Sequence, residues 1–404
     1  MGKSALMLLN SPYPDDIRVR KEINSLSQVV NEIHLICLRR ANERTPDIQT
    51  FLTIHRIDAG KSNYGLAFWD VIMSTFFVHP VFYRKAKSLI RLHNIKIVHV
   101  HDLPLVGTAL LLKRHCGVKV IFDMHENYPE ALPLWFAWKT GWVVRLKNNL
   151  FMNTKRWLHW EKQAVEGSDA IIAVVDEMRA NMLRKYSIDP NKVSVVSNTE
   201  STDFLHQNLD DRIYEKFKDK FILAYVGGLG PHRGVDTAVT GMAEIKSPQT
   251  VMVIVGGGSD AAVAELARQV KALNLSERVF LLGHQPFSKV FSYMKMADVN
   301  VIPHKSNAQN ENGVPHKLFQ SMMTGKPVLV SSCKPLKRIV EAAQAGLVFE
   351  AGNPKDFARQ VERLQQDTEL RKEMGTNGFK AATEGEFSWE KSARALTQLY
   401  STLE

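Results

Sequence analysis

A glycine-rich segment follows the apolar run at residues 221–226 and precedes a helical pattern that starts near residue 235. It reads GGLGPHRG over residues 227–234. Glycines let the backbone come close to a phosphate, and the N-terminus of the next helix adds a positive dipole end. A tight turn between a strand and a helix would use the same residues. No Gly-Lys-Ser/Thr closes the segment, so it is not a P-loop. The segment predicts either an anion site or a structural turn.

A second motif, NENGVPHKLFQSMMTGKPV, occupies residues 310–328. Pro315 fits the first position of a helix, and Gly325 fits its C-cap before a buried strand. The open start of such a helix offers free backbone N–H groups to an anion. Gln320 lies one turn in from that end, near enough to hydrogen-bond a group attached to the anion. The second motif therefore also predicts an anionic ligand.

Histidines occupy or follow two of the expected strands. His125 comes just after the run at 118–123, so we expect it at the carboxyl end of a strand, either facing a ligand or capping a turn. Glu126 is either a ligand-side acid or a residue at a helix start. His99 and His101 lie on one face of a strand, as two ligands of a metal would. Because no further ligand stands at a suitable spacing, we expect no metal.

Short aliphatic runs alternate with amphipathic helical patterns along most of the chain. The runs expected as strands are 5–9, 33–38, 51–57, 97–101, 118–123, 170–175 and 193–197, and then 221–226, 250–255, 278–282, 298–302, 327–331 and 347–349. This alternation predicts parallel sheets with helices on both faces. The polar segment 201–220 separates the two series and is the expected linker. The fold class is thus α/β, with two doubly wound domains whose ligands bind beyond the carboxyl ends of the strands.

Composition supports a folded protein with an anionic partner. The 404 residues are 45% hydrophobic and 23% charged, a balance that excludes a mainly disordered chain. Residues 1–200 hold 27 Lys+Arg against 19 Asp+Glu, so most of the net charge of +10 lies in this half.

The longest uncharged stretches are too short to cross a bilayer, and residues 1–10 suit a strand better than a signal peptide, which predicts a cytoplasmic protein. Three cysteines far apart in sequence argue against a disulfide framework or a zinc site.

The two motifs, with AGLVF and GNPKDFA after them, resemble the donor-binding domain of the retaining GT-B glycosyltransferases of family 4 (group 1). YPDDIRVRKEINSL and FDMHENYP resemble the N-terminal domain of the same family. The resemblance implies two Rossmann-like domains facing across a cleft. Residues 1–205 would bind the acceptor, with a C-terminal helix at about 386–404 packed back on them, and residues 206–385 would bind the donor. It also implies a UDP- or GDP-linked sugar as donor substrate, and neither a metal nor another cofactor.

The resemblance further implies roles for individual residues. Arg233 matches the second member of a basic pair that clamps the diphosphate, Lys317 is expected to assist, and His125 matches a histidine that acts on the transferring sugar. These three are the expected catalytic residues. The expected donor-binding residues are Gly227, Gly228, Gly230, Glu311, Asn312, Gly313, Val314, Pro315, Leu318 and Gln320.

The chain departs from the family pattern at three positions. The first clamp cation falls on Gly228, and the two family glutamates fall on Asn312 and Gln320. Glu311 is one residue out of register and would substitute if the loop shifts. A glutamine should bind a ribose diol more weakly than a carboxylate does, but still specifically. We interpret the chain as a divergent enzyme.

Residues 131–160 contain five of the seven tryptophans, five basic residues and no acidic one. Rings and cations together are typical of a segment that lies among anionic headgroups. The alternative is that the rings belong to the core or to an acceptor groove. The residues expected on the acceptor or membrane side are Glu126, Trp135, Trp138 and Trp142. Nucleic acid is not an expected partner, because no binding motif accompanies the basic charge.

The sequence therefore predicts an enzyme that moves a hexose from a nucleotide-diphosphate sugar to a lipid-linked or glycan acceptor, as in polysaccharide biosynthesis. It would be peripheral on the inner face of the cell membrane. One alternative is a nucleotide-sugar 2-epimerase of the same architecture, which would need carboxylates placed for proton abstraction. The other is a catalytically silent subunit that acts as a binding partner.

Overall fold

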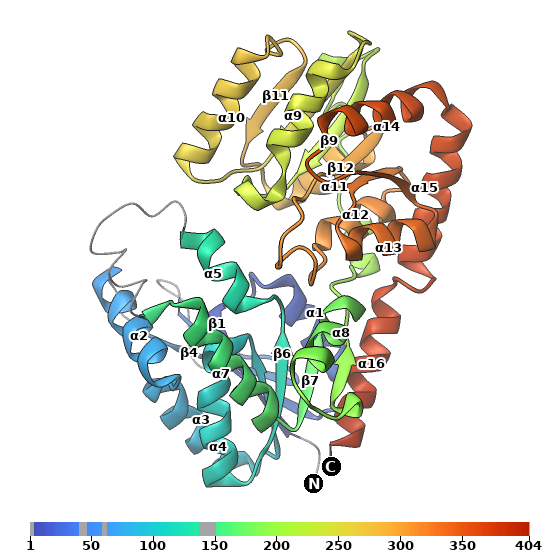
Figure 1. Cartoon of the computed structure of the whole chain (residues 1–404). Helices are drawn as coiled ribbons and strands as arrows, with labels where there is room; N and C mark the ends of the chain where they lie inside the picture. Colours follow the sequence, from blue (N-terminus) through green and yellow to red (C-terminus); the bar gives the residue numbers. More distant parts are fainter. Residues whose placement is uncertain (1–3, 40–46, 59–62, 137–150, 404) are drawn as a thin grey trace. The chain divides into compact units, whose positions relative to one another are not determined.

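The computed structural model describes residues 4–39, 47–58, 63–136 and 151–403. The chain divides into two compact units, one of residues 1–196 with 392–404 and one of residues 197–391. Each unit is built around its own sheet of mainly parallel strands with helices packed on it (Figure 1).

The first unit contains an eight-stranded sheet with the order β3-β4-β2-β1-β5-β6-β7-β8. Its strands are β1 (Ser4–Pro12), β2 (Glu32–Leu38), β3 (Asp47–Ile48), β4 (Leu52–Ile57), β5 (Ile97–His101), β6 (Lys119–Met124), β7 (Ala170–Ala173) and β8 (Val193–Val195). The short edge strand β3, which the sequence patterns missed, pairs antiparallel with β4. The pairs of the other described strands are parallel. Helices cover both faces of such a sheet, which is why the inner strands are continuous aliphatic runs.

The helices of the first unit begin and end at recognisable signals. They are α1 (Ile17–Leu26), α2 (Asn63–Phe76), α3 (Pro80–His93), α4 (Val106–Cys116), α5 (Tyr128–Phe136), α7 (Thr154–Gly167), α8 (Asp176–Lys185) and most of α16 (Trp389–Thr402). The N-cap of α1 is Asp16, whose carboxylate accepts the backbone N–H groups of Arg18 and Val19. Left-handed Asn94 ends α3 and left-handed Gly117 ends α4. Helix α4 contacts both α3 and α7.

The second unit contains a six-stranded parallel sheet with the order β11-β10-β9-β12-β13-β14. Its strands are β9 (Phe221–Val226), β10 (Thr250–Val255), β11 (Val279–Gly283), β12 (Val299–Ile302), β13 (Val328–Ser331) and β14 (Gly346–Phe349). Every residue of β9 and β10 is buried, as expected for central strands covered on both faces.

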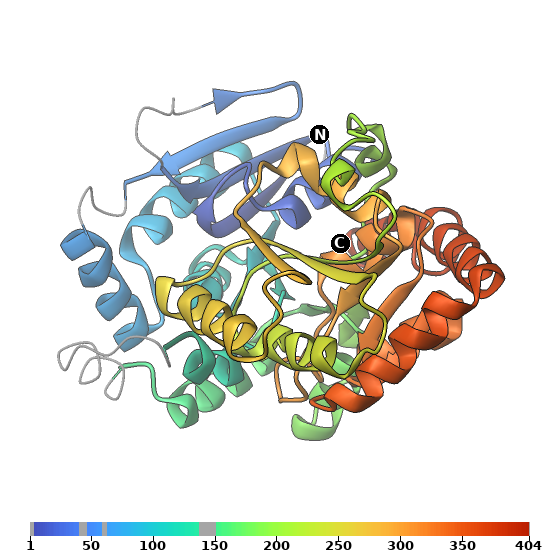
Figure 2. The same ribbon diagram turned by 90° about the horizontal axis from the view of Figure 1, so that it is seen from above.

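The helices of the second unit fall into two packed groups. They are α9 (Val235–Glu244), α10 (Asp260–Ala272), α11 (Val290–Lys295), α12 (His316–Met323), α13 (Lys334–Ala343), α14 (Pro354–Gln366) and α15 (Thr368–Thr383). Right-handed crossovers that run in opposite directions from β9 place their helices on opposite faces of the sheet. Helix α9 packs against α10 and α14, and the views of Figures 1 and 2 show α9 and α10 side by side. Helix α15 contacts α12 and α13.

The polar segment at 201–220, expected as a linker, belongs to the second unit. Its few aromatic residues explain the difference, because they are buried although charged residues surround them. Phe204 packs edge-on against Phe291, and Tyr214 donates a hydrogen bond to the Tyr293 carbonyl oxygen at 2.9 Å. The segment is therefore anchored rather than free.

A membrane-spanning helix is not found in the described ranges, where none is both long enough and apolar enough to cross a bilayer.

Candidate functional site

The glycine-rich loop leaves the carboxyl end of β9 and is held close to its neighbours. The Tyr225 hydroxyl donates to the Gly228 carbonyl oxygen at 2.6 Å. Gly227 has a φ of 149°, which favours glycine, and a Cβ there would lie 3.2 Å from Lys317 Nζ. Gly234 has a φ of 67°, and a Cβ there would meet a backbone carbonyl oxygen at 1.8 Å. Because these two residues have no Cβ, the backbone of the loop can lie close to Lys317 at Gly227 and close to another backbone segment at Gly234.

Two cations, Arg233 and Lys317, lie in this region without a carboxylate partner. Lys317 Nζ is 4.0 Å from the centre of the Tyr225 ring. This buried nitrogen has no hydrogen-bond partner, and neither cation forms an ion pair with a residue that the structure describes. Burial, followed by the charge of Arg233, lowers the pKa of Lys317 well below its usual value. Two cations without counter-charges beside a glycine-rich loop form a site suited to an anion.

Two histidines adjoin the cations and stay neutral near pH 7. Burial, and then Arg233 and Lys317, lower the pKa of His232 to about 4. Burial also lowers the pKa of His304, with further contributions from the same two cations. His304 Nε2 lies 3.3 Å from Arg233 Nη1, so the neutral ring can accept a hydrogen bond from the guanidinium. A Cβ at Gly230 would lie only 2.8 Å from the His232 ring, so this glycine leaves room for the imidazole.

Side chains tie the loop before α12 to its surroundings. Asn310 Nδ2 donates to the carbonyl oxygens of His232 at 2.9 Å and Lys305 at 2.8 Å, which connects this loop to the glycine-rich loop. The Glu311 carboxylate accepts from the Ser306 hydroxyl at 2.7 Å and from the first backbone N–H of α13 at 3.1 Å. The family pattern has a glutamate at the position of Asn312. Glu311 could take its place only if these two hydrogen bonds broke.

The other predicted donor residues of this loop differ in exposure. Asn312 Nδ2 donates to a backbone carbonyl four residues earlier, and Gly313 is half-buried beside it. Val314 and Leu318 are buried, so they support the loop and α12 as apolar packing. Pro315 is the N-cap of α12, not its first helical residue as predicted. The difference of one position has little effect on bonding, because proline has no N–H to donate at either place.

Gln320 is engaged by a partner that the sequence motifs did not identify. Its Nε2 donates to Glu200 Oε2 at 2.8 Å, and both side chains are buried. Glu200 also accepts the Ser201 backbone N–H at 2.9 Å. The two side chains are 120 positions apart in the sequence, so no local pattern connects them.

In the first unit, His125 follows the carboxyl end of β6, where the sequence placed it. His125 Nε2 lies 3.0 Å from Asp123 Oδ2, and Nδ1 lies 3.7 Å from Asp102 Oδ2. Burial disfavours a charge on the ring, but Asp102 and Asp123 outweigh it and raise the pKa of His125 to about 10. His125 is therefore a cation near pH 7, and its side chain is 13% exposed.

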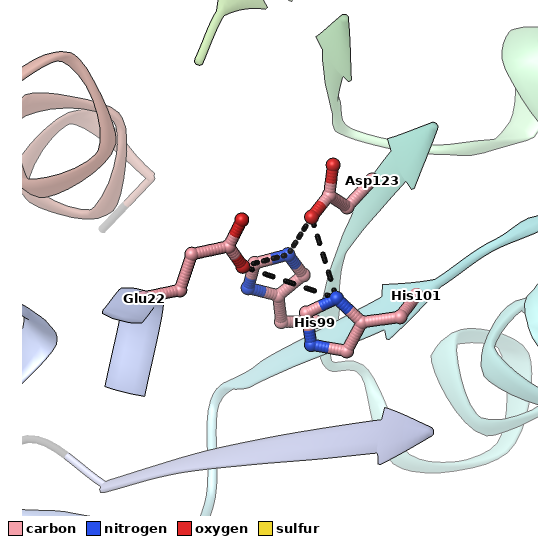
Figure 3. Close-up of side chains that lie close together, drawn as sticks. All are labelled: Glu22, His99, His101 and Asp123. Carbon is pink, nitrogen blue, oxygen red and sulfur yellow. Dashed lines mark ion pairs between the residues drawn. The ribbon is translucent and has the colours of Figure 1, made fainter. Parts of the chain in front are cut away.

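A cluster of buried polar side chains adjoins His125. Its four members are drawn in Figure 3. Glu22 comes from α1, His99 and His101 come from one face of β5, and Asp123 comes from β6. Arg18 Nε donates to Glu22 Oε1 at 2.7 Å, and Arg18 Nη2 donates to Asp123 Oδ1 at 2.5 Å. The sequence singled out the histidine pair but found no further ligand for it. That premise is wrong, because α1 and β6 bring two carboxylates to the histidines.

The tryptophan-rich segment is only partly described. Outside the described part lie Trp138, Trp142 and the side chain of Trp135. Trp157 is fully buried, and Trp160 stacks on Phe77 with ring centroids 4.5 Å apart. Trp157 therefore belongs to the core and not to a membrane-facing surface, whereas Trp160 is half-buried. Glu126 lies just after His125 and is half-buried.

Two family models together match most of the chain. The model of glycosyl transferases group 1 matches residues 206–381, and the model of glycosyltransferase family 4 matches residues 23–203. The chain belongs to the group 1, family 4 glycosyltransferases.

Relatives and solved structures agree with this assignment. An uncharacterized glycosyltransferase of Methanocaldococcus jannaschii is 24% identical over 80% of this chain and 79% of its own length. A D-inositol 3-phosphate glycosyltransferase of Corynebacterium efficiens is 26% identical over 60% of this chain, and the match spans only 58% of that relative. Sucrose-phosphate synthase from Thermosynechococcus elongatus has the same fold, with a TM-score of 0.77, 18% identity and 99% coverage of both chains. HepE of Anabaena in complex with UDP-glucose has a TM-score of 0.72 at 15% identity, again with 99% coverage of both chains. The glycosyltransferase therefore has the GT-B fold.

Proposed function

We propose that this glycosyltransferase moves a hexose from a nucleotide-diphosphate sugar to a lipid-linked or glycan acceptor, with retention of the anomeric configuration. The observation that carries the proposal is the pair of cations, Arg233 and Lys317, beside a glycine-rich loop and without an ion pair among the described residues. The solved complexes of a neighbour of the same fold with UDP-glucose support a nucleotide sugar as the donor. UDP- and GDP-linked donors both fit the charge of the site.

The cations would act on the leaving group. When the bond between the anomeric carbon and the diphosphate oxygen breaks, negative charge grows on the diphosphate. Arg233 and Lys317 would stabilise that charge, together with backbone N–H groups of the loop and of the start of α12. Preorganised charges aimed at a developing charge are commonly the largest catalytic term. No metal ion is part of this proposed transfer step.

His125 would hydrogen-bond the transferring sugar from the first unit. Its position after the carboxyl end of β6 and its partial exposure support this role. Asp102 and Asp123 would hold the ring in place, since each carboxylate lies near one ring nitrogen.

The acceptor side would lie at an anionic membrane surface. Helix α3 supports this, because it contains no acidic residue and exposes Arg84, Lys85 and Arg91. Leu92, beside them, is 75% exposed. Cations with an exposed apolar side chain suit anionic headgroups.

Nucleotide binding by Arg233→Ala tests the donor site. We expect the variant to bind UDP or GDP about 10- to 100-fold more weakly in calorimetry, since it loses charged hydrogen bonds worth about 1.5–3 kcal/mol. Uridine and guanosine should bind the variant and the wild type equally, because they lack the diphosphate. Arg268→Ala is the matched control, an exposed arginine of the same unit that pairs only with Glu265. Equal losses for nucleosides and nucleotides would remove Arg233 from the diphosphate site.

The products separate the proposed transferase from the alternatives. With each of the UDP- and GDP-linked hexoses and no acceptor, the wild type should release free hexose and nucleoside diphosphate slowly. A changed sugar on an intact nucleotide would instead indicate the epimerase. Binding without any turnover, even with lipid-linked acceptors, would indicate the silent subunit.

A further inference from the structure

We propose that Glu22, His99, His101 and Asp123 of the first unit bind one divalent transition-metal ion of the zinc class, which holds α1, β5 and β6 together. Two imidazoles and two carboxylates are a common ligand set for such ions. The ion would be structural, and the transfer step proposed above does not depend on it.

The backbone brings the four side chains together from three elements. Side chains alternate along a strand, so His99 and His101 project from the same face of β5. Asp123 is the direct partner of His101 in the parallel pairing of β5 with β6. Figure 3 shows Glu22 reaching from α1 toward these three side chains.

The distances between the four ligand atoms suit an ion at their centre. Asp123 Oδ2 lies 3.4 Å from His99 Nε2 and 3.3 Å from His101 Nδ1. Glu22 Oε2 lies 4.0 Å and 3.9 Å from the same two nitrogens. Ligands about 2.0–2.2 Å from a tetrahedral zinc ion are roughly 3.3–3.6 Å apart, so small side-chain shifts would complete the site.

Direct hydrogen bonds account for only part of the arrangement, because Asp123 Oδ2 lies within hydrogen-bond distance of both histidines but Glu22 Oε2 does not. The distances from Glu22 Oε2 exceed those of a hydrogen bond, which ends near 3.5 Å. Among the described residues, the buried atoms Glu22 Oε2 and His99 Nε2 have no hydrogen-bond partner, and both side chains are 0% exposed. His101 Nε2, the ring nitrogen outside the proposed ligand set, also has none. Leaving buried polar atoms unpaired costs free energy, and an ion would satisfy the two that converge.

The surrounding residues orient the ligands. Arg18 binds the outer oxygens, Glu22 Oε1 and Asp123 Oδ1, so that Glu22 Oε2 and Asp123 Oδ2 face the centre. Asp123 Oδ2 also lies 3.0 Å from His125 Nε2, so an ion would share this oxygen with His125. His99 Nδ1 lies 2.9 Å from the Tyr400 hydroxyl, which leaves Nε2 for the ion. Such partners of the ligands are a regular feature of metal sites.

A second group in the same unit is more exposed and provides a control. Glu32, His34 and His93 also lie close together, with Glu32 at 3.2 Å from His34 and 3.4 Å from His93. Glu32 is 39% exposed and His93 is 29% exposed. The buried atom His34 Nε2 also has no hydrogen-bond partner among the described residues, but this group offers an ion only one carboxylate, and that carboxylate is partly exposed.

Metal titration of the full chain tests the proposal. Protein stripped with a chelator should bind one equivalent of Co²⁺ per chain and show the intense visible absorption of a tetrahedral ion, which Zn²⁺ should then displace. At a free Zn²⁺ concentration about 100 times Kd, the Tm should rise by about 5–10 °C. Glu22→Gln and His99→Gln should each weaken binding at least about 100-fold, while His93→Gln should bind like the wild type.

Three results would overturn the proposal: no bound ion in the wild type, an unchanged Co²⁺ spectrum in His99→Gln, or a loss of metal binding that occurs only in His93→Gln. If the cluster variants fail to fold, the measurements on the wild type still test the proposal. In crystals grown with Zn²⁺, an anomalous-scattering peak among the four side chains supports the site, and a peak only elsewhere refutes it.

Discussion

Replacing Gln320 with glutamate should destabilise the second unit, because Gln320 Nε2 donates to Glu200 Oε2 at 2.8 Å and both side chains are 5% exposed. The change removes a hydrogen bond to a charged group, worth about 1.5–3 kcal/mol. It also brings two carboxylates together, which would repel by about 4 kcal/mol at 4 Å and an effective dielectric constant of 20. One group can instead take up a proton, which costs about 3.7 kcal/mol at pH 7 for an ordinary glutamate pKa of 4.3. We expect the free energy of unfolding to fall by about 2–4 kcal/mol at pH 7.

The pH dependence of this loss has a definite sign. A carboxyl pair in contact has one pKa raised in the folded state, so the folded variant binds more protons than the unfolded chain. Its stability therefore falls as pH rises above about 4.3 and recovers as pH is lowered toward that value. At pH 7 the Tm should be lower than that of the wild type by about 5–15 °C. Thermal melts at pH 5 and pH 7 measure both effects.

A double variant shows whether Glu200 is the cause. Glu200→Gln combined with Gln320→Glu exchanges the two groups and should recover most of the lost stability. Gln366→Glu, the same change at an exposed position of α14, should leave the Tm almost unchanged. If Gln320→Glu melts like the wild type at pH 7, or the double variant shows no recovery, the reasoning is refuted. By family resemblance alone, glutamate at 320 would simply restore a ribose ligand.

Three further outcomes test other parts of the structure. At a pH above the depressed pKa of Lys317, UDP binding should take up a proton, because a bound diphosphate raises that pKa. Calorimetry in buffers of different ionisation enthalpy should show the uptake and its loss in Lys317→Gln. Affinity should accordingly fall as pH rises. Glu311→Ala should cost about 0.5–2 kcal/mol in urea unfolding by uncapping α13, and a variant as stable as the wild type would contradict the cap. Anionic liposomes should bind the protein at low salt and release it in part at high salt, and Arg84→Glu with Arg91→Glu should weaken binding; no binding to such liposomes would exclude the membrane surface.

The fold was predictable because buried parallel strands leave a strong signal. The runs expected at 221–226 and 250–255 coincide with β9 and β10, where helices on both faces require unbroken aliphatic residues. The two-residue strand β3 leaves no such signal, since it lies at an edge and pairs with a single neighbour. The segment 201–220 was wrongly predicted to be a linker for a similar reason. Its aromatic residues are isolated and form no apolar run in the sequence, yet they are buried in the second unit.

The candidate site was predictable only where a motif is continuous. The glycine-rich loop and the residues around α12 lie in two short segments, and their positions at the ends of β9 and at the start of α12 followed from pattern alone. Sequence could not show what else those side chains contact. From the sequence, Glu311 could be a ligand, but in the structure its carboxylate accepts the first backbone N–H of α13. The sequence showed no partner for Gln320, but in the structure its side chain donates a hydrogen bond to Glu200.

The histidine pair on β5 shows most clearly how spacing can mislead. His99 and His101 have the separation of two ligands on a strand, and the absence of a third ligand nearby argued against an ion. In a parallel sheet, however, neighbouring strands are joined by long crossovers, so residues that meet at one point are far apart in sequence. Asp123 reaches the pair through the register of β5 with β6, and Glu22 reaches it from α1. A ligand search in such folds should therefore compare equivalent positions on adjacent strands, not residues close in sequence.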